Sequence, residues 1–124
     1  MTICDAHVHF FSPGFFRGLG ASTEAIGGLG WDDPVSPEAL ADRWVTELDR
    51  HSVARSSLIA SSPVDADSVA VALSRHRSRF VGFFMLDPSR DDDIFYATHA
   101  LNAGMRVICL FPAMNKVPDR KSVV

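Results

Sequence analysis

Two periodicities of hydrophobic and polar residues alternate along the chain. Strands are predicted where apolar residues alternate with polar ones or run together, at residues 2–10, 55–60, 80–86 and 105–111. Helices are predicted where apolar residues recur every three or four positions, at residues 36–50, 67–75 and 92–102. This alternation predicts an α/β fold with a parallel sheet and right-handed crossovers. The last two strands are almost continuously apolar, which is typical of parallel strands covered on both faces.

The first predicted helix has the clearest sequence signals. Ser36 is a typical N-cap residue, and Pro37 suits the first helical position. Leu40, Trp44 and Leu48 recur at four-residue spacing. These three residues are therefore predicted to form one apolar face of the helix.

The segment between the first predicted strand and the first predicted helix is unusually long. It spans residues 11–35 and contains six glycines: Gly14, Gly18, Gly20, Gly27, Gly28 and Gly30. Long loops at the carboxyl end of a parallel strand commonly carry function in α/β enzymes. We interpret the segment as a lid or substrate loop, with a mobile insertion as the alternative. Its aromatic residues Phe15, Phe16 and Trp31 either close over a substrate or pack the loop.

Composition narrows the function classes. The 124 residues are 47% hydrophobic and 22% charged, with a formal net charge of −3, which excludes a strongly basic nucleic-acid-binding protein. No apolar run reaches the roughly 18–20 residues of a membrane span, and the N-terminus lacks the regions of a signal peptide. No nucleic-acid or membrane partner is expected. Cys4 and Cys109 lie in apolar runs and are interpreted as buried thiols in a reducing, cytoplasmic compartment.

The sharpest chemical feature is the run Asp5-Ala6-His7-Val8-His9. Side chains alternate between the two faces of a strand, so Asp5, His7 and His9 are predicted to share one face. Two imidazoles one pleat apart can chelate a divalent ion, although the pair does not select the metal. A catalytic zinc usually takes three protein ligands plus water. Asp5 would orient a ligand histidine or pair with a basic residue. Two histidines satisfied by hydrogen bonds are the alternative to a metal site.

The other polar candidates are assigned to ordinary structural roles. His51 ends the first predicted helix, His76 lies among arginines at the end of the second, and His99 falls within the third. All three are expected on the surface. Asp91–Asp93 is expected to begin a helix, because no further oxygen ligands for an ion are evident. The stretch Ser61–Pro63 is explained by turn chemistry, with pocket lining as the alternative.

The opening stretch Asp5–Phe10 resembles the start of the metal-dependent amidohydrolase superfamily. It is most similar to the branch of TIM-barrel hydrolases, lactonases and decarboxylases related to aminocarboxymuconate-semialdehyde decarboxylase. The resemblance continues through residues 51–55, 79–83, 86–88 and 103–107. It implies the N-terminal half of a (β/α)8 TIM barrel, with four parallel strands and three helices. One departure is Ser52, where a glycine commonly follows the first helix. With a positive φ, serine there would cost about 1 kcal/mol.

The resemblance also implies a function. His7 and His9 would be metal ligands, with Asp5 behind them, and the divalent metal, expected to be zinc, would activate water or polarise a carbonyl. The family takes its other ligands and its catalytic aspartate from later strands that have no counterpart in this sequence, so no catalytic residue is assigned. The implied substrate is a small lactone, ester or amide. The alternatives are a metal-dependent decarboxylase of the same branch and a non-catalytic half-barrel that binds metal or assembles with a partner.

The number of predicted strands bears on the domain organisation. A closed barrel takes roughly 200–250 residues. We therefore expect residues 1–118 to be a truncated half of one hydrolase domain that is inactive by itself. Residues 119–124 match the translation of a common sequencing adapter and are expected to be a non-native tail. The first and fourth strands would be open edges, through which a homo-oligomer could form.

Overall fold

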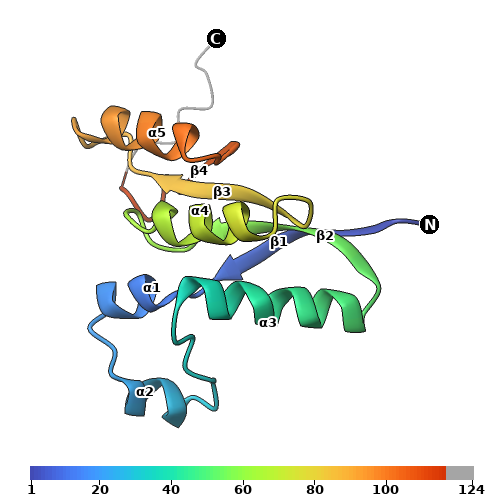
Figure 1. The fold of residues 1–124 in the computed structure, drawn as a ribbon. Coiled ribbons are helices and arrows are strands. Elements are labelled where there is room, and N and C mark those ends of the chain that lie inside the picture. Colours follow the sequence, from blue (N-terminus) through green and yellow to red (C-terminus); the bar gives the residue numbers. More distant parts are fainter. Residues whose placement is uncertain (117–124) are drawn as a thin grey trace.

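The computed structural model describes residues 1–116, whose arrangement is shown in Figure 1. Its elements follow in the order β1 (Ile3–Phe10), α1 (Pro13–Gly18), α2 (Thr23–Gly28), α3 (Pro37–Arg50), β2 (Val53–Ala60), α4 (Ala66–Arg75), β3 (Phe80–Leu86), α5 (Asp93–Asn102) and β4 (Val107–Leu110). The strands form one sheet in the order β1-β2-β3-β4, and each neighbouring pair is parallel. The predicted α/β fold with four parallel strands is confirmed.

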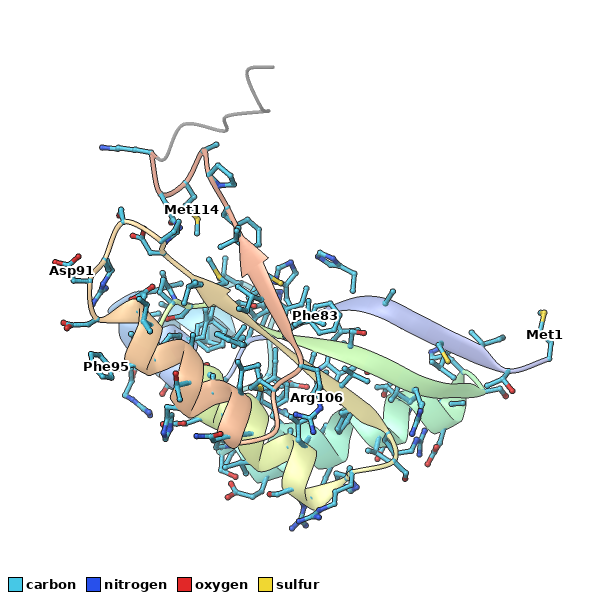
Figure 2. The ribbon with its side chains drawn as sticks, turned by 90° about the horizontal axis from the view of Figure 1, so that it is seen from above. Met1, Phe83, Asp91, Phe95, Arg106 and Met114 are labelled. Carbon is cyan, nitrogen blue, oxygen red and sulfur yellow. The ribbon has the colours of Figure 1, made fainter. Side chains whose placement is uncertain are left out.

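The hydrophobic core lies between the sheet and the helices α3, α4 and α5. Phe10, Leu58 and Phe84 contribute to it from three neighbouring strands, and Val69 of α4 and Ala100 of α5 pack against them. Figure 2 shows these helices on one side of the curved sheet. Full burial of a large apolar side chain contributes about 1.5–3 kcal/mol. The core therefore fixes which face of each strand turns towards the helices.

Helix α3 forms as its sequence signals predict. Ser36 is the N-cap, and its Oγ accepts a hydrogen bond of 3.1 Å from the backbone N–H of Ala39. Leu48 is buried, and Leu40 and Trp44 pack against the core. The predicted apolar stripe is therefore the face that α3 turns towards the sheet.

Residues 11–35 differ from the expected loop, because they contain the two short helices α1 and α2. Ser12 and Ser22 cap these helices by accepting hydrogen bonds from backbone N–H groups three residues later. Gly20 and Gly30 follow the helices with φ values of 67° and 73°, which glycine adopts without strain. Local capping and turn chemistry thus give regular structure to a segment whose glycine content suggested a loop.

Strand β4 forms an edge of the described sheet. Its side chains Val107, Ile108 and Leu110 are 38%, 42% and 54% exposed. The prediction that this strand is covered on both faces is therefore wrong for the described residues, since the described helices pack mainly on β2 and β3. The sheet order also gives β4 no described neighbour beyond β3. An unpaired edge with apolar side chains favours association with another strand.

The cysteines also differ from their prediction. Cys4 is exposed and Cys109 is partly buried, so the interpretation of two buried thiols is wrong for Cys4. The reason is that the first five residues of β1 are all exposed, whereas burial along this strand begins at Val8. Partial burial raises the pKa of the Cys109 thiol.

Two sequence-based expectations concern the chain as a whole. The expected non-native tail, residues 119–124, lies outside the described residues. Among residues 1–116, none of the helices combines the length and hydropathy needed to cross a bilayer.

Candidate metal centre

His7 and His9 lie together at the carboxyl end of β1. Their Nε2 atoms are 3.1 Å apart, and the two ring planes meet at 74°. The neighbouring residues Val8 and Phe10 are buried in the core, whereas both histidines are exposed on the sheet. Alternation along the strand therefore directs both rings away from the helices, as the sequence predicts for these two residues.

The separation of the two Nε2 atoms suits chelation of a single ion. Tetrahedral zinc bound to two imidazoles at about 2.0–2.1 Å holds the nitrogens about 3.3 Å apart. The observed 3.1 Å is close to that value. Without a metal, the same contact is a hydrogen bond in which one ring donates N–H and the other accepts. The pair thus fits a metal by donor type and spacing.

Ser61 fixes the protonation pattern of the His9 ring. Its Oγ donates to the carbonyl of Ile59 at 3.1 Å and lies 2.9 Å from Nδ1 of His9. Because the hydroxyl has a single proton, it accepts from Nδ1–H of His9. The lone pair of His9 is then on Nε2, which is the atom that approaches His7. Ser61 therefore orients His9 in the way that partners of metal-ligating histidines do.

The charge state of His9 also favours a ligand role. Partial burial and the nearby His7 ring lower the pKa of His9 below its ordinary value. Burial disfavours the charged imidazolium, and a second positive charge beside it would be repelled. The neutral ring is the form that binds metal.

Among residues 1–116, Asp5 forms no hydrogen bond or ion pair with either imidazole ring. Its Oδ1 accepts a hydrogen bond of 3.0 Å from the backbone N–H of His7. The β1–β2 register pairs Asp5 with Ser56 and Val8 with Leu58, so β1 has one extra residue in this interval. Such a bulge interrupts the strict alternation of side chains along a strand. The prediction that Asp5 shares a face with the two histidines assumed that this alternation is regular. The role of Asp5 in orienting a ligand stays a prediction.

The histidine pair provides two ligands, and the described residues add no third. Within residues 1–116, no group of three or more His, Cys, Asp and Glu side chains could hold a metal ion. A catalytic zinc usually takes three protein ligands. The described residues therefore contain fewer candidate ligands than a catalytic zinc needs.

An aromatic stack continues from the histidines into residues 11–35. The ring of Phe11 stacks on His9, with centroids 5.6 Å apart and planes within 6°. Trp31 stacks on the same Phe11 ring at 5.4 Å, and Phe16 packs edge-on against Trp31. Phe16 is buried, whereas Trp31 is 47% exposed. The aromatic residues of this segment thus pack beside the histidine pair.

A buried carboxylate fixes the start of α1 to the start of α4. Asp65 accepts hydrogen bonds from the hydroxyl groups of Ser12 and Ser68. All three residues are buried. Both segments follow the carboxyl ends of their strands, so this contact holds the connections that surround the histidines. No periodic pattern in the sequence signals the contact between Ser12 and Asp65, because these two residues are far apart along the chain.

The other histidines lie away from β1. His51 is exposed 3.9 Å from Glu47, and His99 is exposed beside Asp67, as predicted. His76 is not simply solvated: its Nε2 lies 2.7 Å from Asp42, which also accepts from Arg75. These three residues, Asp42, Arg75 and His76, form an α3–α4 network. The hydrogen bonds from Arg75 and His76 hold the pKa of Asp42 well below its usual value.

Comparison with solved structures identifies a similar fold. The crystal structure of a probable 2-pyrone-4,6-dicarboxylic acid hydrolase from Acinetobacter baumannii, with citric acid bound, matches with a TM-score of 0.58 and 16% sequence identity. The match covers 87% of this chain and 37% of that chain, so this chain spans little more than a third of its neighbour's length. No protein-family model and no curated protein matches the chain. The four parallel strands and their helices form an α/β fold consistent with half of a TIM barrel.

Proposed function

We propose that the chain forms part of a metal-dependent hydrolase of the amidohydrolase superfamily, acting on a small lactone, ester or amide. The observation that carries the proposal is the convergence of the His7 and His9 Nε2 atoms, 3.1 Å apart, at the carboxyl end of β1. TIM-barrel enzymes place their active sites at this end of the strands. The expected metal is zinc, because imidazole ligands suit it and the spacing matches its geometry.

The roles of the residues follow from their contacts. His7 and His9 would hold the ion, which when bound would activate a water molecule or polarise a substrate carbonyl. Ser61 would keep the His9 ring in the tautomer that directs its Nε2 lone pair at the site. Phe11 would keep the same ring in plane by stacking on it. These contacts orient His9 before any metal binds.

The structural neighbour favours hydrolysis over decarboxylation. That protein is a probable hydrolase of a pyrone dicarboxylic acid. A pyrone is a cyclic ester, and a cyclic ester is one of the substrates that the sequence resemblance implies. We further propose that the chain by itself binds zinc weakly and hydrolyses no substrate. Two ligands leave the ion too loosely held for catalysis.

Zinc binding by the isolated chain tests the proposal. The double variant His7→Ala/His9→Ala removes the pair, and His51→Ala/His99→Ala is the matched control because it removes two exposed histidines elsewhere. Titration calorimetry with zinc chloride measures affinity, and the NMR signals of the histidine ring protons identify the ligands. Circular dichroism verifies that both variants fold.

We expect saturable binding by the parent chain and the control variant, with shifts confined to the rings of His7 and His9. The double variant His7→Ala/His9→Ala should show no saturable binding. Equal zinc affinity in both variants, or no binding by the parent chain, would refute the metal site. Substrate turnover by the parent chain that survives loss of both histidines would refute the proposed mechanism.

A further inference from the structure

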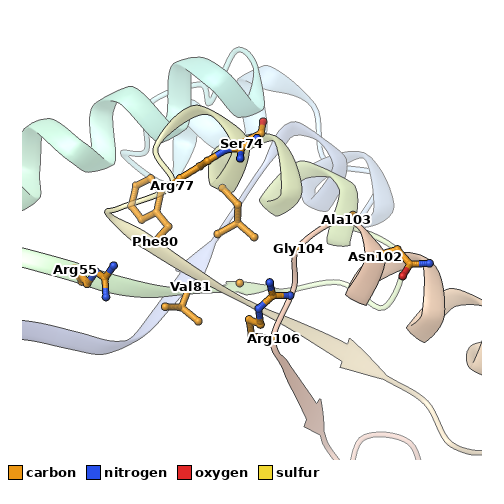
Figure 3. A pocket seen from close by; sticks show the side chains of 11 residues that line it. Arg55, Ser74, Arg77, Phe80, Val81, Asn102, Ala103, Gly104 and Arg106 are labelled. Atoms are coloured by element: carbon orange, nitrogen blue, oxygen red, sulfur yellow. The ribbon is translucent and has the colours of Figure 1, made fainter.

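A basic pocket lies at the amino ends of the strands, opposite to the end that holds the histidines. It has a volume of about 500 Å³ and lies where β3 begins, between the last turns of α4 and α5 (Figure 3). Arg55 of β2, Arg77 of the α4–β3 connection and Arg106, which precedes β4, all line it. Three segments that are distant in sequence thus each contribute an arginine to the lining of one cavity.

The lining contains no acidic residue. Elsewhere in the described chain, arginines commonly lie in ion pairs with carboxylates: Arg50, Arg75, Arg79 and Arg90. Within residues 1–116, none of the three pocket arginines forms such a pair. The positive charge of this pocket is therefore not neutralised by a carboxylate of the described chain, although the net charge of the whole chain is −3.

Two helix ends offset part of this charge. The carboxyl ends of α4 and α5 adjoin the pocket, and each carries a partial charge of about −0.5. The positive charges of three guanidinium groups and the partial negative charges of two helix ends together give a local charge of about +2. Arg55 donates one hydrogen bond to the carbonyl of Ser78, and Arg106 donates one to the carbonyl of Met105. Each guanidinium has five N–H donors, so most of them remain for a ligand.

The floor of the pocket is apolar. Leu73, Phe80 and Gly82 line it on the side of the helices and Val81 lines it on the other face of β3, while Ser74 and Asn102 add polar groups at its rim. A small inorganic anion would leave this apolar surface uncovered. A ligand that carries both an apolar body and an anionic group would match the charge and the floor together.

We propose that this pocket binds a small organic phosphate, whose phosphate group is held by Arg77 and Arg106 and whose apolar part lies on Leu73 and Phe80. Guanidinium forks match the geometry of phosphate oxygens, and such charge-assisted hydrogen bonds are the stronger ones. The concave shape and limited volume favour a small molecule over a polymer. This inference does not depend on the proposed hydrolase activity.

Calorimetry with phenyl phosphate and with inorganic phosphate tests the inference. Arg77→Ala/Arg106→Ala removes two of the positive charges, and Ser74→Glu adds a carboxylate at an exposed rim position without removing an arginine. Arg17→Ala/Arg50→Ala is the matched control, because it removes two exposed arginines outside the pocket. Circular dichroism verifies that each variant folds.

We expect phenyl phosphate to bind the parent chain and the control variant equally, and more tightly than inorganic phosphate does. Binding should weaken by about tenfold or more in Arg77→Ala/Arg106→Ala and in Ser74→Glu, because each change disrupts charge-assisted contacts. Equal affinity across all variants would overturn the inference. So would failure of the parent chain to bind phenyl phosphate, or equal affinity for both phosphates.

Discussion

Ser52 adopts a backbone conformation that serine tolerates poorly. It follows α3 and leads into β2 with a φ of 56°, in the left-handed region. An L-residue there is destabilised by about 1–2 kcal/mol through contact of its Cβ with the backbone. Glycine has no Cβ and is free of that contact. Glycine is also the residue that the sequence resemblance implies at this position. Ser52→Gly is therefore predicted to stabilise the fold.

The magnitude is the difference between two effects. Relief of the left-handed strain stabilises the folded state by about 1–2 kcal/mol. The greater freedom of glycine in the unfolded chain offsets about 0.5–1 kcal/mol of this. The midpoints of the two ranges give a net gain for Ser52→Gly of about 0.7 kcal/mol. For a domain of this size, that corresponds to a rise in melting temperature of about 2–4 °C.

Thermal and urea unfolding followed by circular dichroism measure this gain. Ser78→Gly is the matched control, because Ser78 also lies in an exposed connection before a strand and is not among the residues with positive φ. The control should be neutral or destabilised, since only the unfolded-state effect remains. If Ser52→Gly failed to exceed its control in stability, the assignment of strain to this residue would be refuted.

Three further predictions concern packing, charge and thiol chemistry. Gly82→Ala should destabilise the fold by about 1–3 kcal/mol in urea unfolding, because an added methyl carbon would lie 2.5 Å from Sδ of Met105; an unchanged midpoint would contradict this. Asp42→Asn should remove the part of the free energy of unfolding that depends on ionisation of this carboxylate. The depressed pKa of Asp42 means that its carboxylate stabilises the fold above its unfolded pKa of about 4, and that this contribution is lost as the pH falls through the lower folded value. The parent chain should therefore lose its advantage over the variant in acid, and parallel pH profiles would refute this. Iodoacetamide should alkylate Cys4 before Cys109, because Cys4 is exposed and the thiol of Cys109 has a raised pKa. Peptide mass spectrometry measures the two alkylation rates, and equal rates would contradict this prediction.

The sequence alone predicted the elements whose signals are local. The start of α3 followed from Ser36 and Pro37, and its buried face followed from the spacing of Leu48 and its neighbours. The outward direction of His7 and His9 followed from strand alternation, because Val8 and Phe10 turn into the core. Each of these features depends on residues within a few positions of one another, so a single sequence contains the required information.

Other features depended on contacts between distant segments. Ser61 reaches His9 across the β1–β2 pair, and the bulge that separates Asp5 from the histidines depends on the register between those strands. The basic pocket likewise takes Arg55, Arg77 and Arg106 into its lining from three segments that meet at the sheet. Periodicity reports which face of an element is apolar, but register and side-chain convergence are set by packing between elements.

The sequence by itself therefore determined the order of the four strands and of the three longer helices, the parallel sheet and the pair of histidines at the end of the first strand. Only the tertiary structure decided that two short helices occupy residues 11–35, that Ser61 orients His9 and that Cys4 is exposed. The physical reason is the range of the interactions. Hydrophobic periodicity and capping act over one or two turns of chain, whereas burial, strand register and hydrogen bonds between loops exist only when distant segments meet.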